Sequence, residues 1–198
     1  MSEVTCDMAV SVDGFAAGPN QILEEPLGEG VEERLHTWMF EGRADNVAEV
    51  EAIVDAGAFI MGRNMFSPGR GEWDLDWKGW WGDDPPYHAP VFVLTHHPRE
   101  PLEMQGGSTF NFVTDGIESA LEQARAAAGD RNVSIAGGPA ILNQYIAAGL
   151  IDELRLHIAP MVVGAGARVF EGVRNLTLQP VAGRHTDLVT HVTYRFPR

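Results

Sequence analysis

Short apolar runs alternate with stretches of helical periodicity along most of this chain, and that alternation restricts the fold more than any other feature. Four runs are short enough to be buried strands: Ala58–Met61, Val91–Leu94, Thr109–Val113 and Val133–Ala136. Apolar residues at helical spacing predict helices at 31–42, 47–57, 117–129 and 141–149, each ending at a glycine. Because strands separated by helices are joined by crossovers, they lie parallel in one sheet. The sequence therefore predicts an α/β fold.

The two ends of the chain complete the predicted sheet. Along Val4–Val12, large apolar residues alternate with a small or acidic set that includes Asp7, Ala9 and Ser11. That second face has room for a flat ligand, although an edge strand with one face in water explains the same alternation. Three strand-like segments follow near the C-terminus without a helix between them: Glu153–Ala159, Leu176–Val181 and Leu188–Phe196. We expect one domain, residues 1–198, with helices on both faces of a mixed, mainly parallel sheet of about eight strands and an antiparallel C-terminal edge.

Composition narrows the class of partner. The formal net charge of −14 argues against a nucleic acid or an anionic membrane, because both repel an acidic surface. The one cysteine, Cys6, cannot form an internal disulfide, which fits a reducing compartment. The first residues lack the basic and apolar regions of a signal peptide, and no run approaches the roughly 18 apolar residues of a membrane span. We expect a soluble, cytoplasmic protein that binds a small molecule.

The junction Gly137-Gly138-Pro139 between a predicted strand and a predicted helix carries the strongest local signal. Two glycines let the backbone approach a ligand, and proline fits the first helical turn. The free N–H groups and the positive end of the helix dipole then favour a diphosphate. A Gly-Gly pair alone is more often a structural turn, and the third glycine of the G-x-G-x-x-G fingerprint is absent.

Two further strand ends carry donors. Arg63 follows the strand at 58–61, and its guanidinium fork suits a phosphate, although a lone arginine is more often a solvated surface residue. Thr95, His96 and His97 follow the strand at 91–94. Adjacent histidines in an extended segment point to opposite faces, and no cysteine or carboxylate cluster lies at ligand spacing, so we expect no metal site.

Taken together, these motifs resemble those of a known family. Ser11-Val12-Asp13-Gly14, Ile60-Met61-Gly62-Arg63, Leu94-Thr95 and Ala136-Gly137-Gly138 are similar to the motifs of dihydrofolate reductase. The stretch that contains Gly137–Ala140, Leu150–Leu154, Pro160 and Gly164–Gly166 resembles still more closely the reductase domain of the bifunctional riboflavin-biosynthesis deaminase–reductase. The resemblance covers about Val4 to Phe196 and implies a dihydrofolate-reductase-like fold. The zinc signature of the fused deaminase is absent, and one cysteine cannot supply it.

The resemblance also implies a cofactor, NADPH, lying across the sheet edge. Arg63, beside Gly62, would bind the 2′-phosphate together with Thr95 and His96. The diphosphate would be bound by Gly137, Gly138 and the N–H groups of Ala140 and Ile141, and the backbone of Ala9 would orient the nicotinamide carboxamide. The sequence departs from the family at Met65, where the resembled motif has a hydroxyl.

The substrate side departs further. Leu35, beside His36, occupies the position of the carboxylate that dihydrofolate reductase aims at the pterin, which disfavours folate because a buried amino-pyrimidine would lose its partner. Asp13 and Asp7 are the candidate catalytic acids, although Asp13 before Gly14 is also typical of a turn aspartate. The candidate substrate-binding residues are Ser11, Trp38 and Trp81. Trp73, Trp77, Trp80 and Trp81 form either a lid or a set of packing residues at a loop or dimer contact.

Three functions remain open from the sequence. The first is an NADPH-dependent reductase of the riboflavin type, similar to 5-amino-6-(5-phosphoribosylamino)uracil reductase, that transfers a hydride to a small heterocyclic or ribosylamino substrate. The second is dihydrofolate reductase, and the third is a non-catalytic NADPH- or ligand-binding module on the same fold. The riboflavin-type relatives also imply a homodimer.

Overall fold

The computed structural model describes residues 2–31, 34–67, 69 and 71–197. Its nine-stranded sheet has the order β10-β11-β8-β1-β7-β3-β4-β6-β5, and β2 and β9 form a second, two-stranded sheet. The strands are β1 Val4–Ser11, β2 Phe15–Ala17, β3 Ala58–Gly62, β4 Pro90–Leu94, β5 Leu102–Glu103, β6 Thr109–Val113, β7 Val133–Gly137, β8 Glu153–Ala159, β9 Ala167–Arg168, β10 Gln179–His185 and β11 Thr190–Arg195. The helices are α1 Thr37–Phe40, α2 Val47–Val54, α3 Arg63–Phe66, α4 Ile117–Ala128 and α5 Pro139–Ala147, with 3₁₀ turns at Arg43–Asp45 and Gln105–Gly107.

The pairing confirms the predicted sheet. Strands β8, β1, β7, β3, β4 and β6 pair in parallel, each with its neighbour in the order. Strand β11 pairs antiparallel with both β8 and β10, which is the expected C-terminal edge. The ninth strand is β5, a two-residue segment antiparallel to β6 that is too short to produce a sequence signal.

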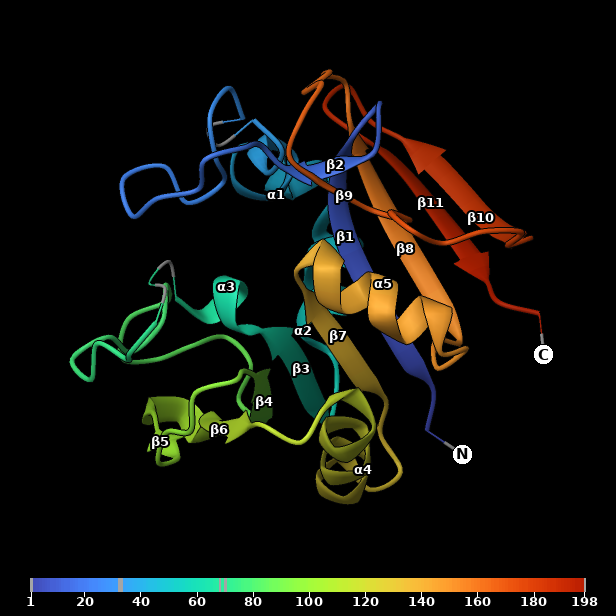
Figure 1. Cartoon of the computed structure of the whole chain (residues 1–198). Helices are drawn as coiled ribbons and strands as arrows, with labels where there is room; N and C mark the ends of the chain where they lie inside the picture. Colours follow the sequence, from blue (N-terminus) through green and yellow to red (C-terminus); the bar gives the residue numbers. More distant parts are fainter. Residues whose placement is uncertain (1, 32–33, 68, 70, 198) are drawn as a thin grey trace.

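Alternate residues of the central strands face two different apolar cores. On β1, the large apolar side chains from Val4 to Val10 join the main core, to which α4 and α5 also contribute. On β3, Ile60 belongs to that core, whereas Phe59 and Met61 belong to a second core with Phe66 of α3. Helices α1 and α2 pack together through a third cluster, which contains Trp38, Val50 and Val189. Figure 1 shows α4 and α5 in front of the sheet and α2 behind it, so helices cover both faces as expected.

The predicted helix over 31–42 is wrong over most of its described length, and its residues 32 and 33 lie outside the described part of the chain. Only Thr37–Phe40 is helical. The reason is that this stretch supplies two separate clusters: Val31 and Leu35 pack with Met161, whereas Trp38 packs with Val50. A single helix would have to present both sets from one stripe.

The predicted strand over Leu176–Val181 is displaced. The observed β10 begins at Gln179 and extends to His185 because its register with β11 sets its limits. All of its residues are exposed, so their hydrophobicity carried no signal of the true ends.

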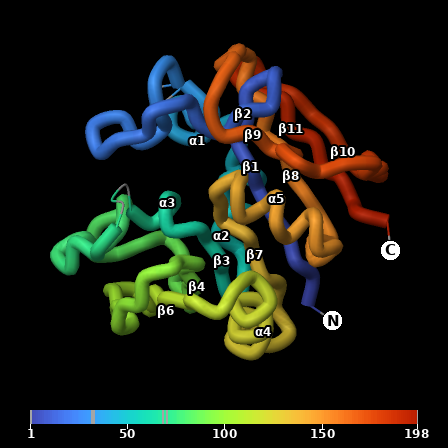
Figure 2. The backbone as a smooth tube through the Cα atoms, in the orientation of Figure 1, coloured from blue at the N-terminus to red at the C-terminus, as the bar shows by residue number. Residues whose placement is uncertain are grey.

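The carboxyl ends of the parallel strands meet at one edge of the sheet. Ser11, Gly62, Leu94 and Gly137 are the last residues of β1, β3, β4 and β7. Figure 2 shows that the long segments following β2 and α3 project from the same side of the molecule in that view. Within the described residues, no helix is long and apolar enough to cross a membrane.

Candidate functional site

Glycines at the end of β3 and after β7 allow close packing at the carboxyl edge. Met61 is the register partner of Gly137, so the two strand ends are neighbours. A Cβ added at Gly62 would lie 2.7 Å from Cγ1 of Ile141 on α5 and 3.8 Å from the backbone nitrogen of Gly138. A side chain at position 62 would therefore require Ile141 on α5 to shift. The structure brings together three of the predicted cofactor residues: Gly62, Gly138 and Ile141.

The start of α5 has an open side. Gly137 has a φ of +122°, Gly138 is the N-cap without a side-chain cap bond, and Pro139 opens the helix. The peptide bond between the two glycines is cis. A Cβ at Gly138 would meet no atom within 4 Å, whereas one at Gly137 would meet Sδ of Met65 at 3.6 Å. Met65, which replaces the expected hydroxyl, therefore lies beside Gly137.

The N–H groups at the start of α5 are partly used. The backbone N–H of Ile141 donates to the carbonyl oxygen of Gly138 at 3.1 Å, and the N–H of Leu142 donates to the same oxygen. Ala140 is exposed. Of the two N–H groups that we predicted to bind a diphosphate, the one of Ile141 already has a partner.

Arg63 is held by the loop that follows it. Its guanidinium carbon lies 4.0 Å from the ring centroid of Trp73, and its Nη2 donates to the carbonyl oxygen of Glu72 at 3.4 Å. Trp73 in turn donates from Nε1 to the carbonyl oxygen of His97 at 2.8 Å. Trp73 therefore connects Arg63 to the turn that contains Thr95 and His96. Arg63, Thr95 and His96, the predicted 2′-phosphate ligands, therefore lie in segments that Trp73 connects.

The turn after β4 is a compact unit. The backbone N–H of His97 donates to Oγ1 of Thr95 at 3.1 Å, and that hydroxyl donates to the carbonyl oxygen of His97. Thr95 is buried and His96 is exposed. Arg99, which sequence reasoning missed, donates from Nη2 to the carbonyl oxygens of Leu75 and Trp77 at 3.0 Å each. It ties this turn to the tryptophan loop, residues 71–82.

Trp73 and Trp77 act as packing residues within that loop. Both pack against the core that contains Phe66, and Trp77 donates to the carbonyl oxygen of Phe66 at 2.7 Å. Trp80 packs on Trp77 with ring centroids 4.8 Å apart. Trp81, a predicted substrate residue, is 45% exposed in this loop. Trp38, the other predicted ring, packs against residues of β8 and β11 in the opposite half of the sheet order.

Asp13 lies in the turn after β1 and holds a distant loop. Its carboxylate accepts hydrogen bonds from the Ser11 hydroxyl at 2.6 Å and from the backbone N–H groups of Val163 and Gly164 at 3.1 and 2.8 Å. These bonds, led by that from Ser11, lower the pKa of Asp13 to about 2. Asp13 is therefore ionised at neutral pH. The Ser11 hydroxyl also accepts from the N–H of Phe15, which leaves it one acceptor lone pair.

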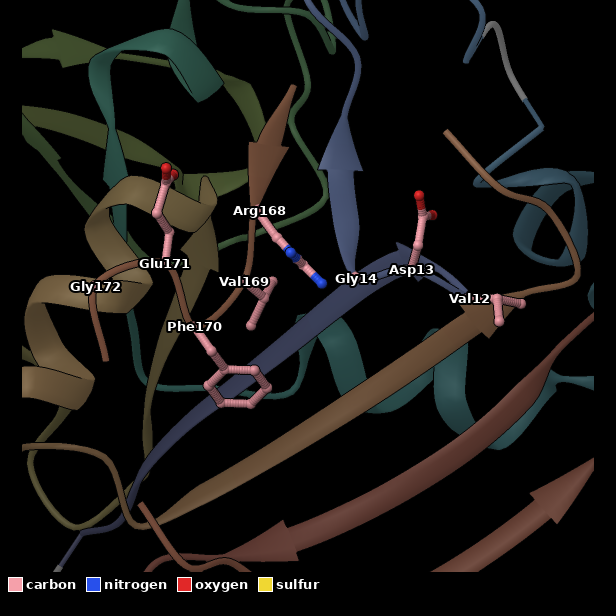
Figure 3. Close-up of a pocket in the computed structure, with 8 residues that line it drawn as sticks. All are labelled: Val12, Asp13, Gly14, Arg168, Val169, Phe170, Glu171 and Gly172. Atoms are coloured by element: carbon pink, nitrogen blue, oxygen red, sulfur yellow. The ribbon is translucent and has the colours of Figure 1, made fainter. Parts of the chain in front are cut away.

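A cavity of about 580 Å³ opens beside Asp13. Its lining residues are Val12, Asp13, Gly14, Arg168, Val169, Phe170, Glu171 and Gly172. Figure 3 shows the Arg168 side chain reaching toward Gly14. Asn143 of α5 fixes this wall, donating to the carbonyl oxygen of Arg168 and accepting from the N–H of Phe170. Arg168 and Phe170 were missed because a two-residue strand has no readable pattern.

Asp7 begins a row of buried polar side chains. Its Oδ1 lies 3.2 Å from Nε2 of His157 on β8, and its Oδ2 lies 3.1 Å from Nη2 of Arg155. Nδ1 of His157 lies 2.7 Å from Nδ1 of His191 on β11. Nε2 of His191 lies 2.9 Å from Oδ1 of Asn46. We call Asp7, His157, His191 and Asn46 the histidine row; the sequence predicted only Asp7.

The histidine row lies at the predicted ligand face of β1. His157 is the register partner of Ala9, and the Trp38 ring lies 4.6 Å from that of His157. Burial, followed by the nearby His157, lowers the pKa of His191 to about 4, and the same two causes lower that of His36 to about 4. In the described ranges, no group of three or more His, Cys, Asp or Glu side chains is placed to bind a metal ion.

Comparison with solved structures identifies the class of fold. The chain superposes on dihydrofolate reductase from Enterococcus faecalis, solved with NADP(H), with a TM-score of 0.61 at 14% identity, covering 99% of this chain and 97% of the other. It superposes on a Shewanella sp. PV-4 protein assigned to riboflavin biosynthesis with a TM-score of 0.69 at 20% identity and 99% coverage of both chains. The chain therefore has a dihydrofolate-reductase-like fold.

The sequence assigns the chain to one family within this fold. The model of the RibD C-terminal domain matches residues 2–193, so the chain belongs to that family. It is similar to the uncharacterized protein YyaP of Bacillus subtilis, with 23% identity over 186 residues, 86% of this chain and 81% of YyaP. It also covers 57% of a deaminase/5-amino-6-(5-phosphoribosylamino)uracil reductase from Thermotoga maritima, with a TM-score of 0.61 and 17% identity. The predicted resemblance is confirmed.

Proposed function

We propose that this protein is an NADPH-dependent reductase that transfers a hydride to a small heterocyclic or ribosylamino substrate. Membership of the RibD C-terminal domain family supports a reductase of the riboflavin type. The single observation that carries the proposal is the approach of Gly62, Gly138 and Ile141 at the carboxyl edge. Such an edge is where open α/β sheets bind their ligands.

The residues at this edge fit an anionic dinucleotide. The space beside Gly138 is open, and the amino end of α5 offers its positive dipole to a diphosphate. Arg63 supplies a planar fork for a 2′-phosphate, with Thr95 and His96 in the adjoining turn. Bound NADPH would supply the hydride. Ala9 would orient its carboxamide from the backbone of β1.

The chain's own residues would orient the substrate and exclude water. Trp38 of α1, Ser11 at the end of β1 and Trp81 of the tryptophan loop are the proposed substrate contacts. Folate remains disfavoured, because Leu35 is buried in an apolar cluster with Val31 and Met161. A pterin there would leave its amino group without a charged partner.

The cofactor assignment is tested by titrating the protein with NADPH and NADH while following tryptophan fluorescence, for which Trp73 on Arg63 is a local reporter. For Arg63→Ala we expect the Kd for NADPH to rise about tenfold to a hundredfold, the loss of one charge-assisted phosphate contact, with little change for NADH. Arg99→Ala is the matched control: it loosens the same loop without removing the phosphate ligand, so it should affect both cofactors equally.

Turnover separates a reductase from a binding module. NADPH oxidation in the presence of a ribosylamino-pyrimidine supports the proposal, whereas NADPH binding without oxidation on any candidate substrate favours the non-catalytic alternative. Equal effects of Arg63→Ala on NADPH and NADH, or no binding of either, would overturn the cofactor assignment.

A further inference from the structure

The hydrogen bonds of the histidine row determine where its protons are. Nδ2 of Asn46 donates to the carbonyl oxygens of Gly42 at 2.7 Å and Trp38 at 3.3 Å. Its Oδ1 therefore faces His191, which fixes the orientation of the amide. Since that oxygen only accepts, Nε2 of His191 must carry a hydrogen.

The next contact fixes the tautomer of the second ring. Two Nδ1 atoms 2.7 Å apart require one donor and one acceptor. The pKa of His191 lies near 4, so this ring is neutral at neutral pH and its Nδ1 accepts. Nδ1 of His157 is therefore the donor.

One proton then remains on the contact between His157 and Asp7. If Asp7 is ionised, Nε2 of His157 must donate to it and the imidazole is fully protonated. If Nε2 has no hydrogen, Asp7 must be the protonated partner. A hydrogen bond between the two side chains therefore requires one proton more than a carboxylate and a neutral imidazole carry together.

The charged groups around the row act on this proton from every side. Arg155 lies against Asp7, and its positive charge disfavours a proton on that carboxylate. Glu153, 3.6 Å from Arg155, offsets part of that positive charge. At the other end, Glu49 pairs with Arg184 at 2.7 Å, and Nη2 of Arg184 also reaches Oδ1 of Asn46. His36 is neutral because of its lowered pKa. Glu153 and Glu49 each lie beside an arginine and offset part of its charge, and Glu153 also pairs with Arg195 at 3.2 Å.

This proton is buried beside the proposed nicotinamide position. The side chains of Asp7 and His157 are 5% and 3% exposed, which limits exchange with bulk water. In parallel strands about 4.8 Å apart, register partners project on the same face, so His157 stands next to Ala9. Nε1 of Trp38, whose ring packs on His157, is a buried donor with no hydrogen-bond partner among the described residues. It offers a hydrogen bond to an acceptor atom of a bound molecule.

We propose that the Asp7–His157 pair is the proton donor of the reduction. The inference rests on the proposed function and names the acid for it. Bound NADPH would supply a hydride, with its two electrons, to the carbon of the substrate's C=N or C=O bond and would leave as NADP⁺. The π bond breaks, and its nitrogen or oxygen takes the proton. Asp7 is left as a carboxylate and His157 as a neutral ring, and solvent returns the proton after product release.

His191 and Asn46 are positioning residues in this scheme. They hold the His157 ring by a bond to the nitrogen that faces away from Asp7. Without that bond the His157 ring can rotate. We therefore expect the Asp7–His157 pair to bind its proton more weakly but still to bind it.

The catalytic part is tested by the pH profile of single-turnover NADPH oxidation. For His157→Gln and Asp7→Asn we expect the rate to fall about 10²- to 10⁴-fold, the usual contribution of a general acid, and the decrease in rate at high pH to disappear. The Kd for NADPH should change less than about threefold, a small effect on this scale. His191→Gln should keep the high-pH limb but shift its midpoint. His185→Gln, an exposed histidine on β10, is the matched control and should leave the profile unchanged.

The proton count is tested separately, by NMR of the ¹⁵N-labelled histidine rings in the wild-type protein. A proton shared at the Asp7–His157 contact at neutral pH supports the inference, and a neutral His157 beside an ionised Asp7 overturns it. Wild-type rates and pH limbs in both Asp7→Asn and His157→Gln also overturn it. If the wild-type chain neither binds nor oxidises NADPH, the proposed function fails instead, and the NMR result still decides the proton count.

Discussion

The sequence around Asp13 is compatible with two different roles for this side chain. The order Ser-x-Asp-Gly suggested either an acid for catalysis or a turn aspartate. In the structure its carboxylate accepts from Val163 and Gly164, about 150 positions along the chain. No local pattern predicts such contacts, because they depend on how β8 and the segment after it return beside β1. Its role in catalysis stays a prediction, and its role as an anchor is observed.

Replacing Asp13 should weaken the contact between the turn after β1 and the segment that contains Val163 and Gly164. In Asp13→Asn the amide keeps the size of the carboxylate but loses its charge, so we expect a lower Tm. The pKa of Asp13 is about 2 in the folded chain and 3.8 ordinarily. The charge therefore stabilises the fold above pH 3.8, and the benefit disappears as the pH falls toward 2. Thermal unfolding across this range should show the Tm difference between the two proteins shrinking with acid. Asp130→Asn, an exposed carboxylate after α4, is the control; a difference independent of pH would contradict the assignment.

The elements themselves differ in how well the sequence predicts them. Buried strands such as β3 and β4, and the amphipathic α4, have one dominant partner, so their periodicity reports it. The one-turn α1 and the exposed β10 are positioned by distant contacts, so the periodicity of their sequences does not predict their limits. The histidine row was missed for the same reason. It exists only because the antiparallel register places His191 opposite His157, and register is a property of paired strands.

The buried contact between His191 of β11 and Asn46, the N-cap residue of α2, should make the free energy of unfolding sensitive to mild acid. The pKa of His191 is about 4 in the folded chain against an ordinary 6.5, because burial penalises its charged form. As the pH falls from 6.5 toward 4, the unfolded chain takes up this proton first, so stability decreases. We expect about 1–3 kcal/mol of the free energy of unfolding to be lost over this window through His191. Denaturant unfolding at a series of pH values measures it.

His191→Gln should reduce this loss, because glutamine can still donate to Asn46 but does not titrate. His96→Gln, on an exposed turn, serves as the control and should retain the wild-type slope. An unchanged slope in His191→Gln would mean that other groups, such as His36, dominate the acid response.

At the scale of the whole molecule, the two edges of the main sheet are unlike each other. One edge is the two-residue β5, whereas the other is β10, with all seven of its residues exposed. A long free edge invites association, but Pro180 and a register irregularity next to it interrupt continuous strand pairing. Exposed Val181 and Leu188 lie on or beside β10. We propose that the expected homodimer forms through the face of this antiparallel edge.

Ionic strength distinguishes this dimer from one held by ion pairs. Each copy carries a formal charge of −14, so two copies repel one another, and salt screens that repulsion. An apolar contact at Val181 should therefore give a dimer whose Kd falls as salt is added, whereas an ion-paired interface would weaken. Sedimentation velocity at low and high salt measures the trend. Val181→Lys should shift the chain toward monomer, and Val162→Lys, at a still more exposed valine after β8, should not. A monomer at every salt concentration, or equal effects of the two lysines, would show that this face is not the interface.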